Sequence, residues 1–542
     1  CADKVCLMSQ PFAISCRGGL NTNLNEVEML RQPGFATRLR NFEVDPDGGY
    51  RRINGFTAFG GSSAARPETN EKILGCFVYG DGVIVCVGTN IYFSQDGTSW
   101  LQINRSSVAN GGDNYTTFTG RSVLTRTGQG QCSFALFEGA TFDYGEVIIA
   151  DGANKLYSFR MEGTGALTAR TFFAFEITVD GSNAVKYVTI HDHHLIAAGV
   201  ENNLNTVYYS VYNDPDNFTG SGAGSVVISD QVQGIRGFRT DLIVFAKNSI
   251  HKLININDSS NIRIDPITEN VGCSSGYSIQ EIGGDLVFLS PDGIRTIAGT
   301  ERIGDVELSS VSRQIQKVLT DITNSINTFT ITSCVLRSKS QYRLFYADDA
   351  LASTVSKGII GTLTQNGFEW SETLGIQALG LVTGFNNNGL EKAYHGDKDG
   401  YIYNHDTGNT FAPAGVSSNI EAIYQTPNLD FGDVGTRKTV KYVRISFSPE
   451  GQTQPTLRMR FDFDDPNIIQ PPDYPLSSIP LPAIFGNVAF GSAVFGATND
   501  PMVRQTVEGS GNNISFRIRS DGSDAPYSIN GLYIDYMPSG RR

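Results

Sequence analysis

Short apolar runs alternate with turn-forming residues along most of the chain, from about residue 60 to residue 412. Each unit holds a short apolar run, a Gly or Asp-Gly turn, a second apolar run and a polar connection. The clearest units span residues 73–103, 145–160, 186–212, 234–254, 276–299, 332–348 and 390–408. Short strands that recur every roughly 40 to 60 residues are typical of β-propeller blades. The pattern therefore predicts an all-β chain with a β-propeller of roughly six to eight blades over residues 60–412.

Turn residues at the centre of these units support this interpretation. Asp-Gly turns occur at residues 80–82, 151–152, 292–293 and 399–400, where a tight hairpin needs residues that tolerate a positive φ. Residues 94–100, SQDGTSW, resemble the Asp-box hairpin of sialidase-type propellers. A single imperfect copy predicts a structural turn and carries no implication of glycosidase chemistry.

One segment, residues 308–326, changes from strand-like to helical spacing. Apolar residues there fall on one helical face, at Ile315, Val318, Leu319, Ile322 and Ile326. Ser310 or Ser312 is the candidate N-cap. We therefore predict one short helix near residues 310–326 that packs on the outside or at the edge of a blade.

The repeating pattern stops near Pro413, and alternation of apolar and polar positions takes its place. Strand-like runs cover residues 420–431, 439–447, 456–463, 514–520 and 529–537. Alternation over runs of this length predicts half-buried strands. We therefore predict a C-terminal β-sandwich over residues 413–542.

An apolar, proline-rich loop at residues 466–501 interrupts this domain. Within it Phe-Gly recurs every five residues, at Phe485, Phe490 and Phe495. Exposed apolar patches usually mark interfaces, so the loop either packs on its own domain or covers a partner subunit. The three phenylalanines are accordingly candidate interface residues.

The first 59 residues lack a core pattern and predict an irregular N-terminal arm. Their stretch GGLNTNLNEVEMLRQPGFATRLRNFEVDPDGGYRRINGF is rich in turn formers and in paired arginines, Arg38 with Arg40 and Arg51 with Arg52. These four arginines are candidate partner-interface residues. The arm is expected to become ordered through its neighbours.

Length and charge narrow the classes of function. A chain of 542 residues exceeds the size of a single core, unless a repeat architecture spreads the core. The formal net charge of −13 argues against a protein that grips nucleic acid over a broad basic face. An acidic wall is nevertheless compatible with DNA that slides past it. No apolar run approaches the length of about 20 residues that a membrane-spanning helix needs.

The eight cysteines are scattered and include no C-x-x-C pair. This spacing fits neither a zinc site nor a small disulfide framework, so reduced thiols are expected and disulfides are the minority alternative. The first residue, Cys1, leaves open a lipoprotein acting as an assembly scaffold.

Three clusters of His, Asp or Gly residues could in principle serve catalysis or metal binding. In HDHH, alternation along a strand predicts His191 and His193 on one face and His194 on the other, and no further ligand lies nearby in sequence. Asp397-x-Asp399-Gly400 is predicted to be a turn, because Gly408 stands where a calcium loop needs a carboxylate. The carboxylates of residues 462, 464 and 465 are expected to form a solvated strand end. No catalytic, cofactor-binding or metal-binding residue is therefore predicted, and the chain is not expected to be an enzyme.

Both ends of the chain resemble tail hub or nozzle proteins of short-tailed bacteriophages. At the N-terminus the matching residues are Gly18-Gly19, Pro33-Gly34, Asn41, Asp47-Gly48-Gly49 and Arg51-Arg52-x-x-Gly55. At the C-terminus YSINGLYIDYMPSGRR, residues 527–542, is similar to the final strand of that family, with its terminal Pro and Gly-Arg-Arg. NDPDNF, residues 213–218, resembles a motif that connects blades in such virion propellers.

This resemblance implies a structural virion protein that forms a ring-shaped tail nozzle or hub. The family forms a homo-oligomeric ring, usually a hexamer, that docks to tail adaptor proteins and carries fibres or spikes. The ring conducts double-stranded genome DNA during ejection without sequence-specific binding, in a virion assembled in the host cytoplasm. The alternative function is a glycan-binding or glycan-cleaving propeller, such as a receptor-binding tail protein or a glycosidase.

Overall fold

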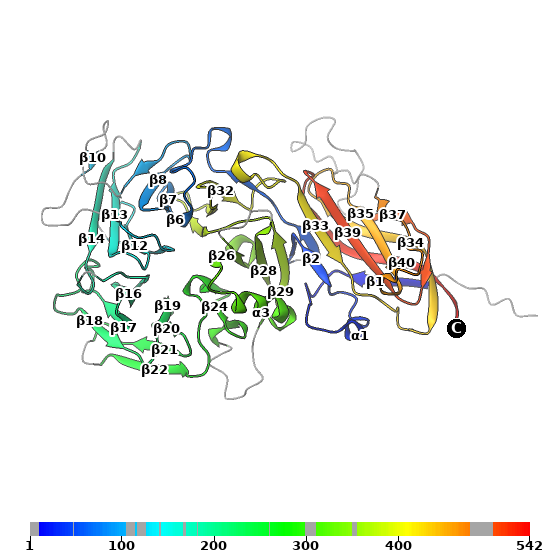
Figure 1. Cartoon of the computed structure of the whole chain (residues 1–542), viewed down its shortest axis with the longest axis horizontal. Helices are drawn as coiled ribbons and strands as arrows, with labels where there is room; N and C mark the ends of the chain where they lie inside the picture. The colour runs from blue at the N-terminus through cyan, green and yellow to red at the C-terminus, as the bar shows by residue number, and fades with distance from the viewer. Residues whose placement is uncertain are drawn as a thin grey trace, which may run out of the picture.

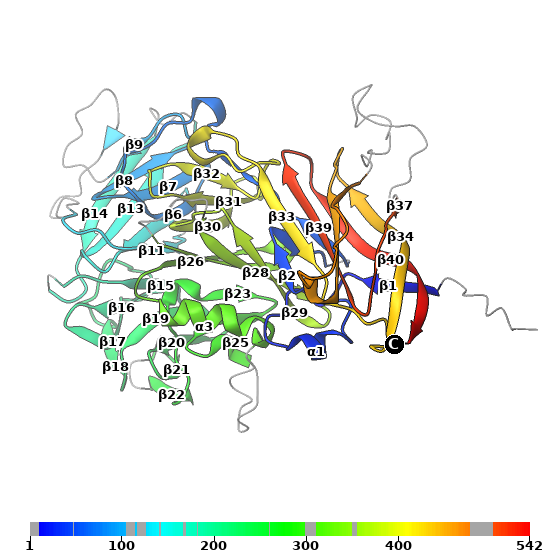
Figure 2. The ribbon, with the colours of Figure 1, turned by 45° about the vertical axis from the view of Figure 1, so that its right-hand side comes forward.

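The computed structural model describes residues 10–46, 48–103, 114–115, 126–139, 143–165, 170–181, 183–258, 261–298, 311–348, 355–476 and 502–541. A β-propeller occupies one end of the molecule and packed C-terminal sheets occupy the other, as Figure 1 shows. Figure 2 gives the same arrangement after a turn of 45°. The predicted all-β fold, with a propeller followed by a C-terminal sheet domain, is confirmed.

The propeller is built of consecutive antiparallel sheets. The first sheet contains β6 (Ile73–Tyr79), β7 (Gly82–Val87), β8 (Asn90–Ser94) and β9 (Leu101–Gln102). The second contains β10 (Asn114–Tyr115), β11 (Ser133–Phe137), β12 (Glu146–Ala150), β13 (Leu156–Glu162) and β14 (Thr171–Ile177), and β10 pairs parallel with β14. The third contains β15 (Tyr187–His191), β16 (His194–Val200), β17 (Asn203–Tyr209) and β18 (Gly224–Val227). Each of these sheets coincides with one of the repeating units that the apolar pattern predicted.

The remaining sheets complete the ring. They contain β19 (Val232–Phe238), β20 (Asp241–Ala246), β21 (Ile250–Ile254) and β22 (Arg263–Thr268); β23 (Gln280–Ile282), β24 (Asp285–Ser290) and β25 (Gly293–Thr296); β26 (Thr330–Leu336), β27 (Gln341–Ala347), β28 (Lys357–Thr364) and β29 (Gly367–Leu374); and β30 (Gly380–Phe385), β31 (Glu391–Gly396), β32 (Ile402–His405) and β5 (Phe56–Ala58). Six blades thus have four or five strands, and the smaller sheet β23–β25 lies between two of them.

Buried apolar side chains fill the space between successive sheets. Ile84 and Tyr157 belong to the cluster between the first two sheets, and Ile73 and Ile402 belong to the cluster that closes the ring. Inner strands such as β7 and β16 are therefore buried on both faces, which explains why they are buried at every position. The core of this long chain is spread around a ring.

The N-terminal segment closes the propeller. Strand β5 pairs antiparallel with β32, so that Phe56 lies opposite His405 and Ala58 opposite Tyr403. Just before β5, at Gly55, the backbone passes very close to that of Thr410. A Cβ added to Gly55 would lie only 1.8 Å from the Thr410 carbonyl oxygen. Only glycine fits this crossing.

Replacing Gly55 by alanine is expected to loosen this closure. The new methyl group would clash with backbone atoms that cannot rotate away, and overpacking of this kind costs about 1–3 kcal/mol or more. We expect Gly55→Ala to lower the midpoint of thermal unfolding, measured by circular dichroism. Gly522→Ala is the matched control, since its Cβ would meet its nearest neighbour, Asp524, at an ordinary 3.8 Å. Equal midpoints for the two variants would contradict the closure role.

The predicted helix is present but shorter than expected. Helix α3 (Gln316–Asn324) follows a single 3-10 turn, Arg313–Ile315, and packs against β25 (Figure 2). Leu319 and Ile322 are buried, as the helical spacing predicted. Ser312 does not cap the helix, because its hydroxyl accepts the Ile294 N–H at 2.9 Å instead. The alternative cap, Ser310, lies outside the described residues.

One short helix escaped the sequence analysis. Helix α1 (Glu26–Met29) begins with a capping box, in which the Asn25 side chain accepts the Glu28 N–H and the Glu28 carboxylate accepts the Asn25 N–H. The N-x-x-E signature was readable from the sequence. A single turn carries no periodicity, which explains why the apolar pattern did not reveal it.

The C-terminal domain consists of two packed sheets. The first contains β3 (Phe42–Val44), β4 (Tyr50–Arg52), β40 (Tyr527–Arg541), β34 (Thr436–Pro449) and β37 (Met502–Thr506), with β1 (Gln10–Ser15) beside β40 and β38 (Ser510–Gly511) beside β34. The second contains β2 (Arg38–Arg40), β33 (Ile420–Gln425), β39 (Ile514–Gly522), β35 (Thr456–Phe461) and β36 (Tyr474–Pro475). Val443 and Phe447 of the first sheet share one buried core with Phe516 and Met459 of the second. The sandwich-like arrangement therefore follows from two half-buried sheets.

Over residues 10–46 and 48–59 the N-terminal segment is not an irregular arm, and this corrects the prediction for that part of residues 1–59. Its described part contributes β1, β3 and β4 to one C-terminal sheet, β2 to the other and β5 to the propeller. Strand β2 pairs with both β29 and β33, so a single nine-stranded sheet runs from a propeller blade into the C-terminal domain. Residues that order this segment belong to the same chain, and because they are distant in sequence no local pattern revealed them.

Candidate functional site

The outward face of β2 carries Arg38 and Arg40, two of the predicted interface residues. Between them Leu39 is fully buried in the core, and strand alternation therefore turns both arginines toward the other face. Arg38 lies opposite Gln425 of β33, and Arg40 lies opposite Ile423. The structure thus places both residues on one half-exposed surface of the C-terminal domain.

Neighbouring strands extend this surface with further arginines. Gln425 also lies opposite Arg517 of β39, which in turn lies opposite Arg458 of β35. Residues directly opposite one another share a face, and residues two positions along a strand share it too. The resulting arginine face consists of Arg38, Arg40, Arg458, Arg460, Arg517 and Arg519.

Carboxylates neutralise the rim of the arginine face. Arg519 pairs with Glu421 and with Asp521, each at 2.9 Å. On the opposite side, Arg460 pairs with Asp464 at 3.1 Å and Arg458 pairs with Asp473 at 3.4 Å. Such exposed ion pairs contribute little to stability, but they balance the local charge.

At the centre of the face one carboxylate lies near, that of Glu372 on β29, which is opposite Arg40 and interacts with the charges of both Arg40 and Arg38. Arg38 and Arg40 form no ion pair within the described part of the chain, and Arg517 donates only to the neutral Gln425 side chain, at 2.9 and 2.7 Å. Burial lowers the pKa of Arg517, and the neighbouring charges of Arg458, Arg38 and Arg460 lower it further. Guanidinium groups held together in this way present ready donors to carboxylate or phosphate groups.

Arg51 and Arg52 do not belong to this surface. Arg51 pairs with Glu43 at 2.7 Å and with Glu450, and Arg52 is 1% exposed. Arg52 donates to the backbone carbonyls of Asn409, Asp524 and Gly522. The prediction that Arg52 faces a partner is therefore wrong, because its guanidinium is enclosed where the propeller meets the C-terminal domain.

Sequence analysis missed four members of the arginine face. Arg458, Arg460, Arg517 and Arg519 alternate with buried apolar residues in TLRMRF and SFRIRS, as Arg38 and Arg40 do in RLR. That shared alternation was a readable signal, although the pairing of the strands was not. The other predicted interface residues, Phe485, Phe490 and Phe495, lie outside the described residues, as does most of the loop 466–501.

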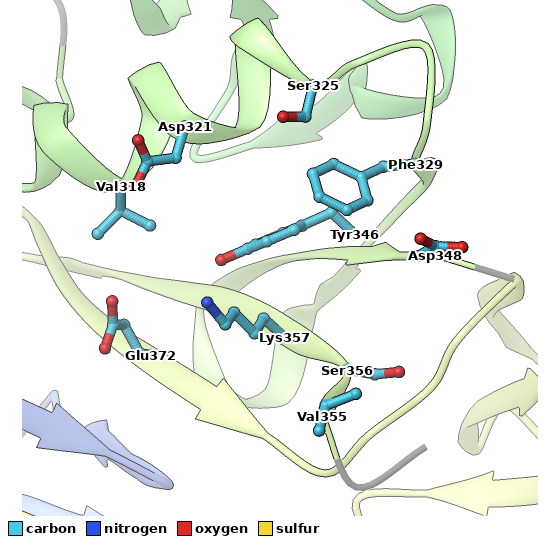
Figure 3. Close-up of a pocket in the computed structure, with 10 residues that line it drawn as sticks. All are labelled: Val318, Asp321, Ser325, Phe329, Tyr346, Asp348, Val355, Ser356, Lys357 and Glu372. Atoms are coloured by element: carbon cyan, nitrogen blue, oxygen red, sulfur yellow. The ribbon is translucent and has the colours of Figure 1, made fainter. Parts of the chain in front are cut away.

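A cavity of about 290 Å³ lies beside the arginine face, between α3 and strands β27–β29. Figure 3 shows the side chains of Asp321, Tyr346 and Lys357 directed into this space. The rings of Phe329 and Tyr346 pack edge to face at 5.5 Å and form an apolar wall. Burial raises the pKa of Glu372, the carboxylate across the cavity, while Arg40, Lys357 and Arg38 oppose that shift. The cavity combines an aromatic wall with hydrogen-bonding groups of both charges.

The histidine cluster does not form a two-histidine site. Asp192 and His193 adopt left-handed φ values of 48° and 62° at a hairpin turn, so His191 lies opposite His194 on the adjacent strand. This corrects the expectation of one continuous strand. His194 is buried and contacts the Ser210 carbonyl at 2.6 Å and Asn257 at 2.7 Å. Among the residues that the structure describes, no three or more His, Cys, Asp or Glu side chains are grouped so that they could hold a metal ion.

The remaining motifs have structural roles. In SQDGTSW, the Asp96 carboxylate accepts the Thr98 and Ser99 N–H groups, which confirms the predicted turn. Asp397 likewise accepts the Asp399 and Tyr401 N–H groups.

NDPDNF lies between β17 and β18 of a single sheet, so it does not connect two blades, contrary to the resemblance noted for it. The six described cysteines are all buried and unpaired. Nowhere in the described ranges is a helix long and apolar enough to cross a membrane.

Comparison with known proteins adds only distant structural likenesses. No protein-family model and no curated protein matches the chain. The extracellular domain of a hybrid two-component system from B. thetaiotaomicron is similar at 10% identity and a TM-score of 0.35, over 65% of this chain and 39% of that one. An exo-β-1,3-galactanase from Phanerochaete chrysosporium is 10% identical, with a TM-score of 0.26, over 89% of this chain and 100% of that one.

The Pan2 WD40 domain from Neurospora crassa is 10% identical, with a TM-score of 0.27, over 68% of this chain and 90% of that one. At these scores the neighbours carry no argument about function.

Proposed function

We propose that this chain is a structural virion protein that forms the ring-shaped tail nozzle or hub of a short-tailed bacteriophage. In this role it docks to a tail adaptor, carries fibres or spikes, and conducts double-stranded genome DNA during ejection. The virion is its site of action, after assembly in the host cytoplasm.

One observation carries this proposal: the two ends that resemble the nozzle family form a single structural unit. Strands β1, β3 and β4 of the N-terminal segment all take part in the sheet that contains β40, the C-terminal strand. Ile14 lies opposite Leu532, and Tyr50 lies opposite Ile529. Segments separated by nearly the whole chain thus build one platform, which fits a shared role for them.

Charge distribution supports a docking role for the second C-terminal sheet, which packs against this platform. The chain has a formal net charge of −13, yet the arginine face concentrates positive charge on one sheet. A closed ring of identical subunits needs two different surfaces that complement each other. Surfaces of opposite charge steer partners together and fix their orientation. We propose a homo-oligomeric ring, with a hexamer as the expected form.

Charge reversal of Arg38 and Arg40 tests this proposal. We expect Arg38→Glu/Arg40→Glu to fold normally but to enter assembled particles at least tenfold less often. Each lost charge-assisted hydrogen bond is worth about 1.5–3 kcal/mol, and about 1.4 kcal/mol corresponds to a factor of ten. The measurement is the amount of the variant in purified particles, together with negative-stain images of the isolated chain.

Arg263→Glu is the matched control for this experiment. Its side chain is 67% exposed on β22, far along the chain from the platform, and it pairs with Asp265. We expect this variant to be incorporated normally. Normal incorporation of the Arg38→Glu/Arg40→Glu variant would reject the docking role, and a stable monomer in the images would reject the ring.

A second candidate function is a propeller that binds or cleaves glycans. The cavity in Figure 3 favours it, because the rings of Phe329 and Tyr346 adjoin the carboxylates of Asp321 and Glu372. Aromatic faces and hydrogen-bonding side chains together suit a sugar ring. A monomer that binds oligosaccharides and loses binding on Tyr346→Ala would favour this function over the nozzle.

A further inference from the structure

The inner strands of the propeller surround a cavity of about 230 Å³. The residues that line it belong to strands β6, β11, β19, β23, β26 and β30, whose positions Figure 2 shows, and to the 3-10 turn Gly276–Ser278. The rings of Phe77 and Phe134 stack in its wall at 5.4 Å. Ligand cavities for larger molecules usually start at about 300 Å³, so this space suits a small molecule.

Most polar groups in this cavity already have partners on a neighbouring strand. The Tyr277 hydroxyl donates to the Gln131 carbonyl at 2.6 Å, and the Gln280 amide donates to the Ser333 carbonyl at 2.9 Å. Thr383 donates to the Val335 carbonyl at 2.9 Å. The last two bonds connect adjacent sheets, and the first joins the turn before β23 to the segment before β11, so the groups serve the closure of the ring.

Arg236 differs from them. It projects from β19 into the cavity, and it makes no hydrogen bond or ion pair within the described part of the chain. Arg236 is exposed to solvent, although protein atoms crowd around part of its guanidinium and desolvate it. This crowding lowers the pKa of Arg236; the Arg337 charge lowers it further, and only Glu281 opposes the shift.

Without a bound ligand, a guanidinium that has no ion-pair partner in this cavity lowers the stability of the fold. A partly desolvated charge whose counter-charge, Glu281, forms no ion pair with it destabilises the fold. Low-dielectric walls also focus its field into the cavity, which raises the local concentration of anions. A guanidinium offers parallel N–H donors that match the two oxygens of a carboxylate or phosphate.

We propose that Arg236 binds an oxyanion, the carboxylate or phosphate group of a small molecule, inside the propeller cavity. The stacked rings of Phe77 and Phe134 provide an apolar wall for the rest of that molecule. This site is separate from the arginine face, and it does not depend on the proposed role in a phage tail.

Thermal unfolding with added anions tests the site. Wild-type protein is titrated separately with inorganic phosphate, with glucuronate and with neutral glucose, at constant ionic strength. We expect phosphate or glucuronate to raise the unfolding midpoint saturably, by at least about 1 °C, because a ligand bound to the folded state stabilises it. A shift with phosphate alone identifies a phosphate ligand, and a shift with glucuronate alone identifies a carboxylate.

Arg236→Gln separates binding from a structural role. We expect this variant to lose the anion-dependent shift and to unfold at a higher midpoint than wild type without anions, since the unpaired charge is gone. Arg239→Gln is the control, because Arg239 stacks on Phe238 and donates to the Gly284 carbonyl at 3.2 Å. It should keep the shift.

Three results would overturn the proposal. The first is a wild-type midpoint that neither phosphate nor glucuronate changes. The second is a shift with glucose equal to that with glucuronate, which would remove the role of charge. The third is an anion-dependent shift that survives in Arg236→Gln.

Discussion

Glu43→Ala is expected to lower the free energy of unfolding by about 3–5 kcal/mol, the cost of removing one partner from a buried ion pair. Glu43 lies on β3 and is 2% exposed. Its carboxylate accepts from Arg51 at 2.7 Å, from Lys339 at 2.9 Å and from Arg343 at 2.9 Å. These three cations hold the pKa of Glu43 below its usual value, against the effect of burial.

The consequence of this substitution follows from the geometry. Arg343 is almost fully buried, and after loss of Glu43 the carboxylate of Asp406, at 3.1 Å, would be its one remaining ion-pair partner among the described residues. Glu43 comes from the N-terminal segment, whereas Arg343 and Asp406 come from two propeller blades. The variant should therefore also expose the N-terminal segment to proteolysis.

Glu450→Ala is the control for this prediction. It removes the other carboxylate that pairs with Arg51, and the Glu450 side chain is 46% exposed. An exposed ion pair is worth about 0–1 kcal/mol, so this variant should unfold close to wild type. Chemical unfolding followed by fluorescence measures both variants. Equal losses would show that Glu43 is no more important than a surface group.

The second large effect is a loss of stability at mildly acidic pH, caused by His395 and His405. Both are buried, and burial lowers the pKa of His395 to about 3. Burial holds the pKa of His405 well below its usual value; the charges of Arg343 and Lys339 add to this shift, and Asp406 opposes it. Arg343 lies 3.1 Å from His405 Nε2, and His405 Nδ1 lies 3.1 Å from His395 Nδ1. Because the guanidinium can only donate, both imidazoles are held neutral in the fold.

The sign of the pH effect follows from proton linkage. The unfolded chain protonates its histidines near pH 6.5 while the fold keeps these two neutral, so the unfolded state binds more protons below that pH. Stability is therefore complete above about pH 6.5 and falls by about 1.4 kcal/mol per pH unit for each buried histidine as the pH decreases. Urea unfolding at pH 7.5, 6.5 and 5.5 measures the slope.

His395→Asn should reduce this slope by about one proton, even if it lowers stability at every pH. His193→Gln is the matched control, since His193 lies on the β15–β16 hairpin turn. It should keep the wild-type slope. An identical slope in all three proteins would contradict the assignment of the acid sensitivity to His395.

Local patterns predicted much of the fold. Alternation of apolar runs with Asp-Gly turns identified the blades, because inner strands such as β7 and β16 are buried on both faces and each hairpin needs residues that tolerate a positive φ. Helical spacing found Leu319 and Ile322 on the buried face of α3. Alternation likewise found the C-terminal strands that carry Arg458 and Arg517.

The predictions failed where a tight turn interrupts a strand and where a residue contacts groups that are distant in sequence. A two-residue turn at Asp192 and His193 reversed the strand that alternation predicted to continue. The interface prediction failed for Arg52 because nothing local showed that distant backbone carbonyl groups would enclose its guanidinium.

The sequence by itself determined the class of fold, the sites of the turns and the alternation that turns arginines outward, because these depend on contacts between near neighbours. Only the tertiary structure decided which strands lie side by side. It joined Arg38 to Arg517 through Gln425, enclosed Arg52, and left Arg236 alone in the propeller cavity. Such pairings bring together residues hundreds of positions apart, and the free energy that selects them comes from burying two whole surfaces against each other.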